Sequence, residues 1–308
     1  MLRDLEDTLG RSVNHASIPN PNTIRVVTFN MSGRFVLEAI GGLGNRMRAL
    51  DSAIGFCKKY DKELHLVWPY FKGLNCPFES LFEVPKNVRT LSSPSEYSRN
   101  KLIRNLKVAR RKIAAGLYRL SFDKVINKKD VYELMQKRFN FNELSRIRNL
   151  RIQTDQRFYS NEKPFEDFRP VKKIRNEIDR YKKIFGNLNV IGVHIRRTDH
   201  IASINCSPTE KFIDLMREEL EKDSTTRFFV ATDSAEEEEI LTEKFSDKII
   251  TYKKTSLNRE SIQGIQDALI DMYLLANTNK IIGSFTSSFS EVAAEIGKIP
   301  LIIVGKDI

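Results

Sequence analysis

The chain has few cysteines and no long apolar run, and these absences exclude several classes of protein. Its three cysteines are far apart and form no CxxC pair, which argues against both a disulfide framework and a zinc site. No apolar run approaches the ~18 residues that span a bilayer. The first ten residues include three acidic side chains and lack the apolar segment of a signal peptide. We therefore expect a protein that is cytoplasmic as encoded, with ordinary free thiols.

Positive charge is present in excess. The chain has 51 Lys and Arg against 40 Asp and Glu, a net charge of +11, which favours polyanions such as nucleic acid, anionic lipid or a nucleotide diphosphate. Eight basic residues fall within residues 99–119, where apolar residues recur every three or four positions as in an amphipathic helix. This segment is either a solvated helix face or a peripheral contact with an anionic membrane or acceptor. No nucleic-acid-binding motif accompanies it, so we expect no nucleic acid partner.

A chain of 308 residues predicts about two domains. Strands and helices alternate in both halves, which is typical of doubly wound α/β domains with parallel sheets. We expect a tail with one strand at 23–29 over residues 1–34, an α/β domain with a basic helical insertion over 35–170, and a second α/β domain over 171–308. The expected strands are 35–40, 64–68, 190–195, 228–232, 249–252, 280–284 and 301–304. The expected helices are 46–60, 171–185, 208–220, 235–245, 265–276 and 288–296.

The first chemical motif is the glycine turn at residues 41–46, which follows a predicted strand and opens a helix. Gly42 and Gly44 permit a sharp turn and a close backbone approach to a ligand, and helix amides attract anions. A purely structural turn is the alternative. The turn lacks the Lys and Ser/Thr of a Walker loop and the spacing of the dinucleotide fingerprint, so the ATPase and dehydrogenase interpretations lose support.

The second motif is HIRRTD at residues 194–199, where a predicted strand ends in two arginines. Ligands of open α/β sheets bind at the carboxyl ends of strands. Consecutive residues at a strand end point in different directions, so one arginine can bind a diphosphate while the other pairs with Asp199. The alternative is a structural ion-pair corner, although His194 and Arg196 share one face and are costly to bury without a partner.

The third motif combines Asp271 with a hydroxyl-rich turn at residues 284–290, between a predicted strand and a helix. Ser287 and Ser288 are either simple helix N-caps or donors to phosphate oxygens, together with the free amides of the helix.

These motifs occur in a recognisable order. GGLGNRM at 41–47, HIRRTD at 194–199, FVATDS at 229–234 and the segment 270–297 together resemble the superfamily of α1,2-, α1,6- and protein O-fucosyltransferases, including the nodulation fucosyltransferase type. The resemblance covers about residues 35–70 and 188–305. It implies a GT-B fold, with two Rossmann-like domains facing a cleft, an acceptor-side domain at 35–170 and a nucleotide-sugar-binding domain at 171–308. It further implies inverting transfer of fucose from GDP-fucose to a glycan hydroxyl, with no cofactor and no required metal.

The resemblance also implies roles for single residues. Arg196 would hold the β-phosphate and stabilise the leaving GDP, and is the expected catalytic residue. Arg197 and Asp199 would support the position of Arg196. The other expected contacts of GDP-fucose are His194 and Asp271 at the guanine, Asp233 at the ribose or as loop support, Ser287 and Ser288 at phosphate, and Gly42, Gly44 and Asn45 from the N-terminal domain.

One departure concerns the catalytic base. In α1,6-type relatives a glutamate follows the HxRRxD motif at a position that corresponds here to Ile204, and the sequence has no Glu between Asp199 and Glu210. His200 is possible by residue type, but we assign no base. A GT-B transferase with another nucleotide sugar, and an inactive relative that binds GDP or polyanions, therefore stay open as alternatives.

Overall fold

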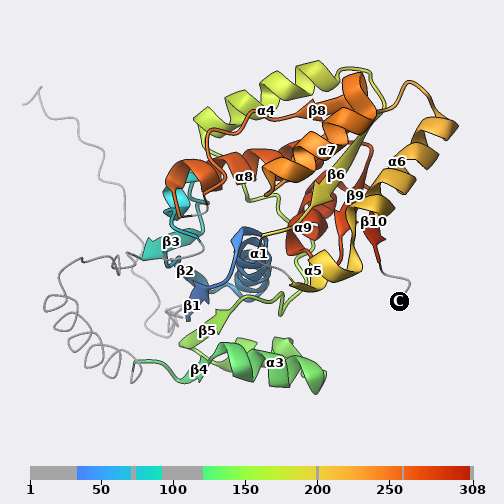
Figure 1. Ribbon diagram of the computed structural model, residues 1–308. Coiled ribbons are helices and arrows are strands. Elements are labelled where there is room, and N and C mark those ends of the chain that lie inside the picture. The colour runs from blue at the N-terminus through green and yellow to red at the C-terminus, as the bar shows by residue number, and fades with distance from the viewer. Residues whose placement is uncertain (1–32, 71–73, 92–120, 199–200, 259, 306–308) are drawn as a thin grey trace, which may run out of the picture. The chain divides into compact units, whose positions relative to one another are not determined.

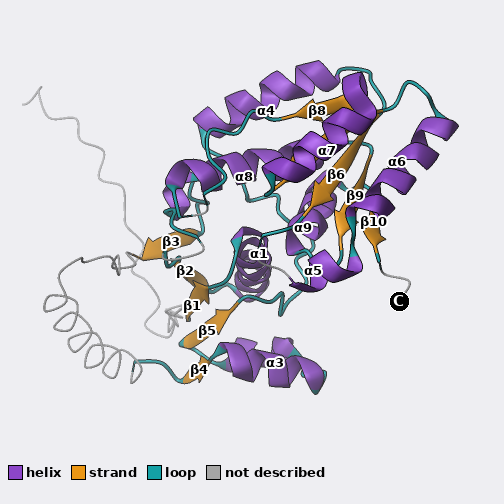
Figure 2. Cartoon of the chain, in the orientation of Figure 1, coloured by secondary structure: helices purple, strands orange, loops and turns teal. Residues whose placement is uncertain are grey.

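The computed structural model describes residues 33–70, 74–91, 121–198, 201–258 and 260–305, and within these ranges the chain forms two parallel β-sheets (Figures 1 and 2). The two sheets with their flanking helices confirm the predicted α/β class. The predicted strand at 23–29 and the basic helix at 99–119 lie outside the described residues.

The first sheet has the strand order β3-β2-β1-β5-β4, and every neighbouring pair is parallel. Its strands are β1 (Arg34–Ala39), β2 (Glu63–Val67), β3 (Val88–Leu91), β4 (Lys124–Ile126) and β5 (Leu150–Thr154). Strands β4 and β5 are absent from the predicted strands, and β4 falls within residues 95–150, which the sequence predicts as basic and helical, so that prediction is wrong for β4. Strand β5 can carry polar side chains because they find a partner in the sheet. Arg151 and Gln153 both donate to the carboxylate of Glu38 on β1, at 2.6 and 2.9 Å.

The second sheet has the order β10-β9-β6-β7-β8, again parallel throughout. Its strands are β6 (Val190–Ile195), β7 (Arg227–Thr232), β8 (Ile249–Thr251), β9 (Lys280–Ser284) and β10 (Leu301–Val304). All six residues of β6 are buried, as expected for a central parallel strand covered on both faces. The chain leaves β6 toward β7 on one side and later returns to β9 on the other, so the strand order reverses beside β6.

Helices and short 3₁₀ turns connect the strands. The α-helices in the described ranges are α1 (Leu43–Tyr60), α3 (Lys128–Gln136), α4 (Lys172–Phe185), α5 (Ile201–Cys206), α6 (Thr209–Lys222), α7 (Ala235–Phe245), α8 (Ile262–Leu275) and α9 (Ser288–Gly297). The 3₁₀ turns are η1 (Phe78–Ser80), η2 (Phe141–Arg146) and η3 (Ser246–Lys248). None of these described helices combines the length and the apolar character needed to cross a membrane.

The second sheet is covered on both faces. Phe228 and Val230 of β7 pack in one apolar cluster with Phe212 of α6 and Leu241 of α7. The alternate residues of β7 face a second cluster that contains side chains of α4, α8 and α9. This arrangement confirms a doubly wound sheet, in which ligands bind where the strand order reverses.

The predicted boundary between residues 170 and 171 falls in the sequence between the last strand of the first sheet and helix α4. All described residues belong to one compact unit, and the division into two domains stays a prediction. Helix α1 packs against α9, which brings the glycine turn of the first half close to the hydroxyl-rich turn of the second.

Candidate functional site

Apart from Asp271, which lies on α8, the described site residues predicted in the second half gather at the carboxyl ends of β6, β7 and β9. Arg196 and Arg197 directly follow β6, Asp233 follows β7, and Ser287 lies in the turn after β9. Because β6 pairs with β7 on one side and with β9 on the other, these three loops meet at the reversal of strand order. Asp199 and His200 lie outside the described residues, so the expected bracing role of Asp199 stays a prediction.

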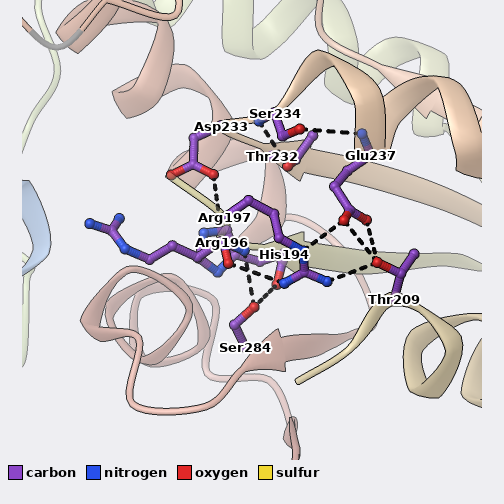
Figure 3. Close-up of polar contacts among 9 residues, drawn as sticks. All are labelled: His194, Arg196, Arg197, Thr209, Thr232, Asp233, Ser234, Glu237 and Ser284. Atoms are coloured by element: carbon purple, nitrogen blue, oxygen red, sulfur yellow. Dashed lines mark hydrogen bonds and ion pairs between the residues drawn. The ribbon is translucent and has the colours of Figure 1, made fainter. Parts of the chain in front are cut away.

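The two consecutive arginines point in different directions (Figure 3). Arg197 donates from Nε to Glu237 Oε1 at 2.7 Å and from a terminal nitrogen to Thr209 Oγ1 at 3.1 Å, and its side chain is largely buried. The Thr209 hydroxyl also contacts Glu237, at 2.8 Å. The guanidinium of Arg196 extends to the other side, away from this ion pair. The two arginines therefore diverge as the strand pleat predicts, and Arg197 pairs with Glu237, a partner that the sequence did not identify. Binding of a diphosphate by Arg196 stays a prediction.

The backbone around Arg196 is held by two neighbouring strands. Its N–H donates to Ser284 Oγ at 3.0 Å, and the Ser284 hydroxyl donates to the carbonyl oxygen of His194 at 3.2 Å. On the other side, the carboxylate of Asp233 accepts from the N–H of Arg197 and from Thr198 Oγ1, both at 2.7 Å. Asp233 thus joins the loop after β6 to the loop after β7 through hydrogen bonds. Loop support is one of its two expected roles.

His194 and Asp271 line one small cavity of about 60 Å³. The ring of His194 stacks on Phe289 of α9, with ring centroids 4.8 Å apart and planes inclined by 22°. Asp271, on α8, is only 4% exposed, and its Oδ1 has no hydrogen-bond partner among the described residues. Lys254 is the charged neighbour of the carboxylate, with its Nζ 3.2 Å from Oδ2.

Burial dominates the protonation of Asp271. It raises the pKa of this carboxyl to about 7, although the ammonium of Lys254 acts in the opposite direction. Burial of a polar atom without a hydrogen-bond partner costs free energy. A hydrogen bond from a ligand to Oδ1 would therefore be favourable. Strongly perturbed carboxyls inside cavities are frequent at functional sites.

The turn after β9 presents a helix N-terminus. Thr286 adopts a left-handed backbone with φ of 53°, and α9 begins at Ser288 with Ser287 as its N-cap. The Ser287 side chain makes no capping hydrogen bond in this part of the structure. The first amides of such a helix and the positive end of its dipole attract anions. Binding of phosphate by Ser287 and Ser288 stays a prediction.

The glycine turn after β1 reaches this helix from the first half. Gly41 has φ of 86°, and the fully buried Arg46 donates from Nε to the Gly41 carbonyl at 2.7 Å. Helix α1 begins at Leu43, three residues earlier than predicted, so Gly44 and Asn45 belong to its first turn. A Cβ at Gly44 would lie 2.8 Å from the carbonyl oxygen of Ser288, so close packing of two helices requires this glycine.

Asn45 and Gly42 differ in their surroundings. Asn45 Oδ1 accepts from Arg48 at 2.7 Å, and Arg48 forms an ion pair with Glu291 of α9, also at 2.7 Å. A Cβ at Gly42 would meet no atom within 4 Å. Contact of Gly42, Gly44 and Asn45 with a ligand stays a prediction.

The residues that sequence reasoning missed are Lys254, Glu237, Thr209, Ser284 and Phe289. Ser284 and Phe289 lie inside the motif region, whereas Lys254, Glu237 and Thr209 come from segments without a local motif. Ile204, at the position where the resemblance would place the glutamate of α1,6-type relatives, lies in α5 and is partly exposed. Within the described ranges there is no group of three or more His, Cys, Asp or Glu side chains that could hold a metal ion.

Comparison with known proteins identifies the fold. The chain matches no protein-family model. The fucosyltransferase NodZ from Bradyrhizobium is similar with a TM-score of 0.57 and 20% identity, over 85% of this chain and 92% of NodZ. Arabidopsis thaliana FUT1 in complex with GDP gives a TM-score of 0.55 and 16% identity, over 88% of this chain and 70% of FUT1. POFUT1 in complex with GDP gives a TM-score of 0.53 and 14% identity, over 90% of this chain and 99% of POFUT1. The predicted resemblance to fucosyltransferases is thus confirmed at the level of the fold.

Proposed function

We propose that the chain is an inverting, metal-independent fucosyltransferase that moves fucose from GDP-fucose to a hydroxyl of a glycan. The observation that carries the proposal is the buried Oδ1 of Asp271, which has no hydrogen-bond partner among the described residues and lies in a cavity that His194 and Asp233 also line, beside the loop of Arg196. A carboxylate there suits a base with ring N–H donors, and an arginine with a helix N-terminus suits a diphosphate. NodZ was soaked with GDP-fucose, and FUT1 and POFUT1 were solved in complex with GDP, which supports the same donor for this fold.

In this proposal the donor spans the three loops. Guanine contacts Asp271 and His194, the diphosphate contacts Arg196, and Ser287 and Ser288 bind phosphate at the start of α9. Arg197, Asp233 and Asp199 hold Arg196 in place, and Gly42, Gly44 and Asn45 approach the donor from the first half. Both Arg197 and Asp233 are already engaged within the protein, which suits a supporting role.

The chemistry follows from charge development. The acceptor oxygen attacks the anomeric carbon opposite the GDP, and the bond from that carbon to the β-phosphate oxygen breaks with its electron pair on the phosphate. Negative charge therefore grows on the leaving group, and Arg196 binds the transition state more strongly than the ground state. The acceptor hydroxyl loses its proton as the new bond forms. No side chain is assigned as its base.

Donor turnover tests this function. Purified protein is incubated with radiolabelled GDP-fucose and a panel of glycan acceptors, and labelled product and its anomeric configuration are measured. We expect transfer with inverted configuration, and a loss of about 10²–10³-fold in kcat for Arg196→Ala, comparable to removal of one transition-state donor. GDP binding without transfer to any acceptor would instead identify an inactive relative. The absence of GDP binding would exclude the proposal.

A further inference from the structure

Lys254 is a buried lysine in a segment without a motif. It follows β8, its side chain is only 9% exposed, and its Nζ lies 3.2 Å from Asp271 Oδ2 and 3.7 Å from Glu238 Oε2. Fully or nearly buried lysines are rare in proteins unless paired. Burial works to lower the pKa of Lys254, but Asp271 and Glu238 more than offset this and leave the pKa raised. The group is therefore an ammonium at neutral pH.

Lys254 and Asp271 line the same small cavity, together with His194 and Phe289. Lys254 also lines a larger pocket of about 540 Å³ that adjoins this cavity. An ammonium has three donors, and a carboxylate can accept on both oxygens. The cavity thus presents a hydrogen-bond donor directly beside an acceptor.

This pair complements one nucleobase edge. Guanine presents the acceptor O6 next to the donors N1–H and N2–H, which match an ammonium beside a carboxylate. Adenine places an amino donor where guanine has O6, and uracil places a carbonyl oxygen where guanine has the N2 amine. Adenine would therefore meet the ammonium with a donor, and uracil would meet the carboxylate with an acceptor.

We propose that Lys254 is a specificity-determining residue that donates from Nζ to O6 of the bound guanine, while Asp271 accepts from N1–H and N2–H. This inference rests on the proposed GDP-fucose site and adds a residue to it. The alternative is that Lys254 only neutralises Asp271. The two roles predict different effects on nucleotide affinity. A lysine that only neutralises Asp271 would leave the affinity independent of the atom at position 6 of the base.

Nucleotide analogues separate these roles. The ligands are GDP, the GDP analogue with sulfur in place of O6, and inosine diphosphate, which lacks the N2 amine. Because sulfur is a weak acceptor, wild type should bind GDP at least about tenfold more tightly than the sulfur analogue. Lys254→Met should reduce this preference to about twofold or less but keep the preference for GDP over inosine diphosphate, which depends on Asp271. Both GDP and the sulfur analogue present the same N–H donors, so their ratio does not depend on the protonation of Asp271.

Lys253→Met is the matched control, since Lys253 is the exposed neighbour in sequence and should leave all ratios unchanged. Lys254→Arg retains donors and charge and should restore part of the preference. An unchanged preference in Lys254→Met would overturn the inference and leave Lys254 as a neutralising partner. If that variant does not fold, equal affinity of wild type for GDP and the sulfur analogue overturns it as well. Failure of wild type to bind any of the three nucleotides would overturn both this inference and the proposed function.

Discussion

Gly44 and Ser288 touch so closely that no side chain fits between them. A Cβ on Gly44 would lie 2.8 Å from the carbonyl oxygen and 3.0 Å from the Oγ of Ser288. The first turn of α1 therefore positions the first turn of α9, where the phosphate is proposed to bind. The glycine turn supports the site through packing, whether or not it also touches the donor.

Gly44→Ala is expected to destabilise the protein by about 1–3 kcal/mol, because an overpacked contact forces the backbone to shift. It should also weaken GDP binding, since the start of α9 moves. Gly42→Ala is the control for stability, because its site is open and its φ of -74° is allowed for alanine. Denaturant unfolding and calorimetry measure both effects. Equal stability of the two variants would contradict the packing role of Gly44.

Arg197→Ala should lower the free energy of unfolding by about 3 kcal/mol, because it leaves the buried Glu237 carboxylate without its partner. Both side chains of this pair are nearly buried, at 14% and 10% exposure. Arg217→Ala is a matched control, since its ion pair with Asp214 is exposed and such pairs contribute less than about 1 kcal/mol. Similar unfolding midpoints for the two variants would show that Arg197 does not hold the loop after β6.

Donor affinity should depend on the protonation of Asp271. The pKa of this carboxyl in the free protein is about 7, and hydrogen bonds from guanine favour the ionised form. Binding therefore releases a proton at acid pH, and the affinity for GDP-fucose should be about tenfold lower at pH 6 than at pH 8. GDP-fucose is the suitable probe because both of its phosphates are esterified and do not titrate in this range. Calorimetry in two buffers of different ionisation enthalpy measures the proton release.

The raised pKa of Asp271 also predicts how the stability of the fold changes with pH. The folded state binds the proton of Asp271 more tightly than the unfolded chain, so this group stabilises the fold at low pH. That contribution is lost as pH rises from about 4 to about 7. The groups around the carboxyl are Lys254, Glu238, Asp267 and, in the same cavity, His194. If the pH dependence of donor affinity persists in Asp271→Asn, another group titrates and the predicted dependence on Asp271 is wrong.

Metal independence is a further expectation. Because the cationic Arg196 is proposed to stabilise the leaving diphosphate, fucose transfer should proceed at the same rate in EDTA and in Mg²⁺. Rates measured on one enzyme preparation, dialysed against chelator and then supplemented with Mg²⁺ or Mn²⁺, provide the test. Loss of transfer in EDTA with recovery on adding metal would show that Arg196 does not act alone.

Strands buried on both faces were the easiest elements to predict. The bounds of β6 and β9 coincide with the predicted 190–195 and 280–284, because continuous apolar runs leave little choice of structure. Strand β5 was missed because Arg151 and Gln153 make it look polar, and only the sheet shows that both bind Glu38. The start of α1 was placed too late because its N-cap, Gly42, has no side chain to mark it.

Candidate site residues were predictable from the sequence where they lie at or just after strand ends in local motifs. His194, Arg196 and Ser287 are of this kind. Lys254 was not, because it reaches Asp271 only through the placement of β8 beside β7, and nothing in its own segment marks it. The partner of Arg197 was missed for a similar reason, since Glu237 belongs to an acidic run that is typical of an exposed helix.

The proposed function requires a GDP site with Arg196 at its phosphate end. Calorimetric titration of the purified protein with GDP, UDP and ADP in EDTA, repeated on Arg196→Ala, tests it most directly. We expect wild type to bind GDP and to bind UDP and ADP at least about tenfold more weakly, and Arg196→Ala to lose at least about tenfold in GDP affinity, as for a charged hydrogen bond. Equal affinity for the three nucleotides, or GDP binding that Arg196→Ala leaves unchanged, would show that the chain has no such site.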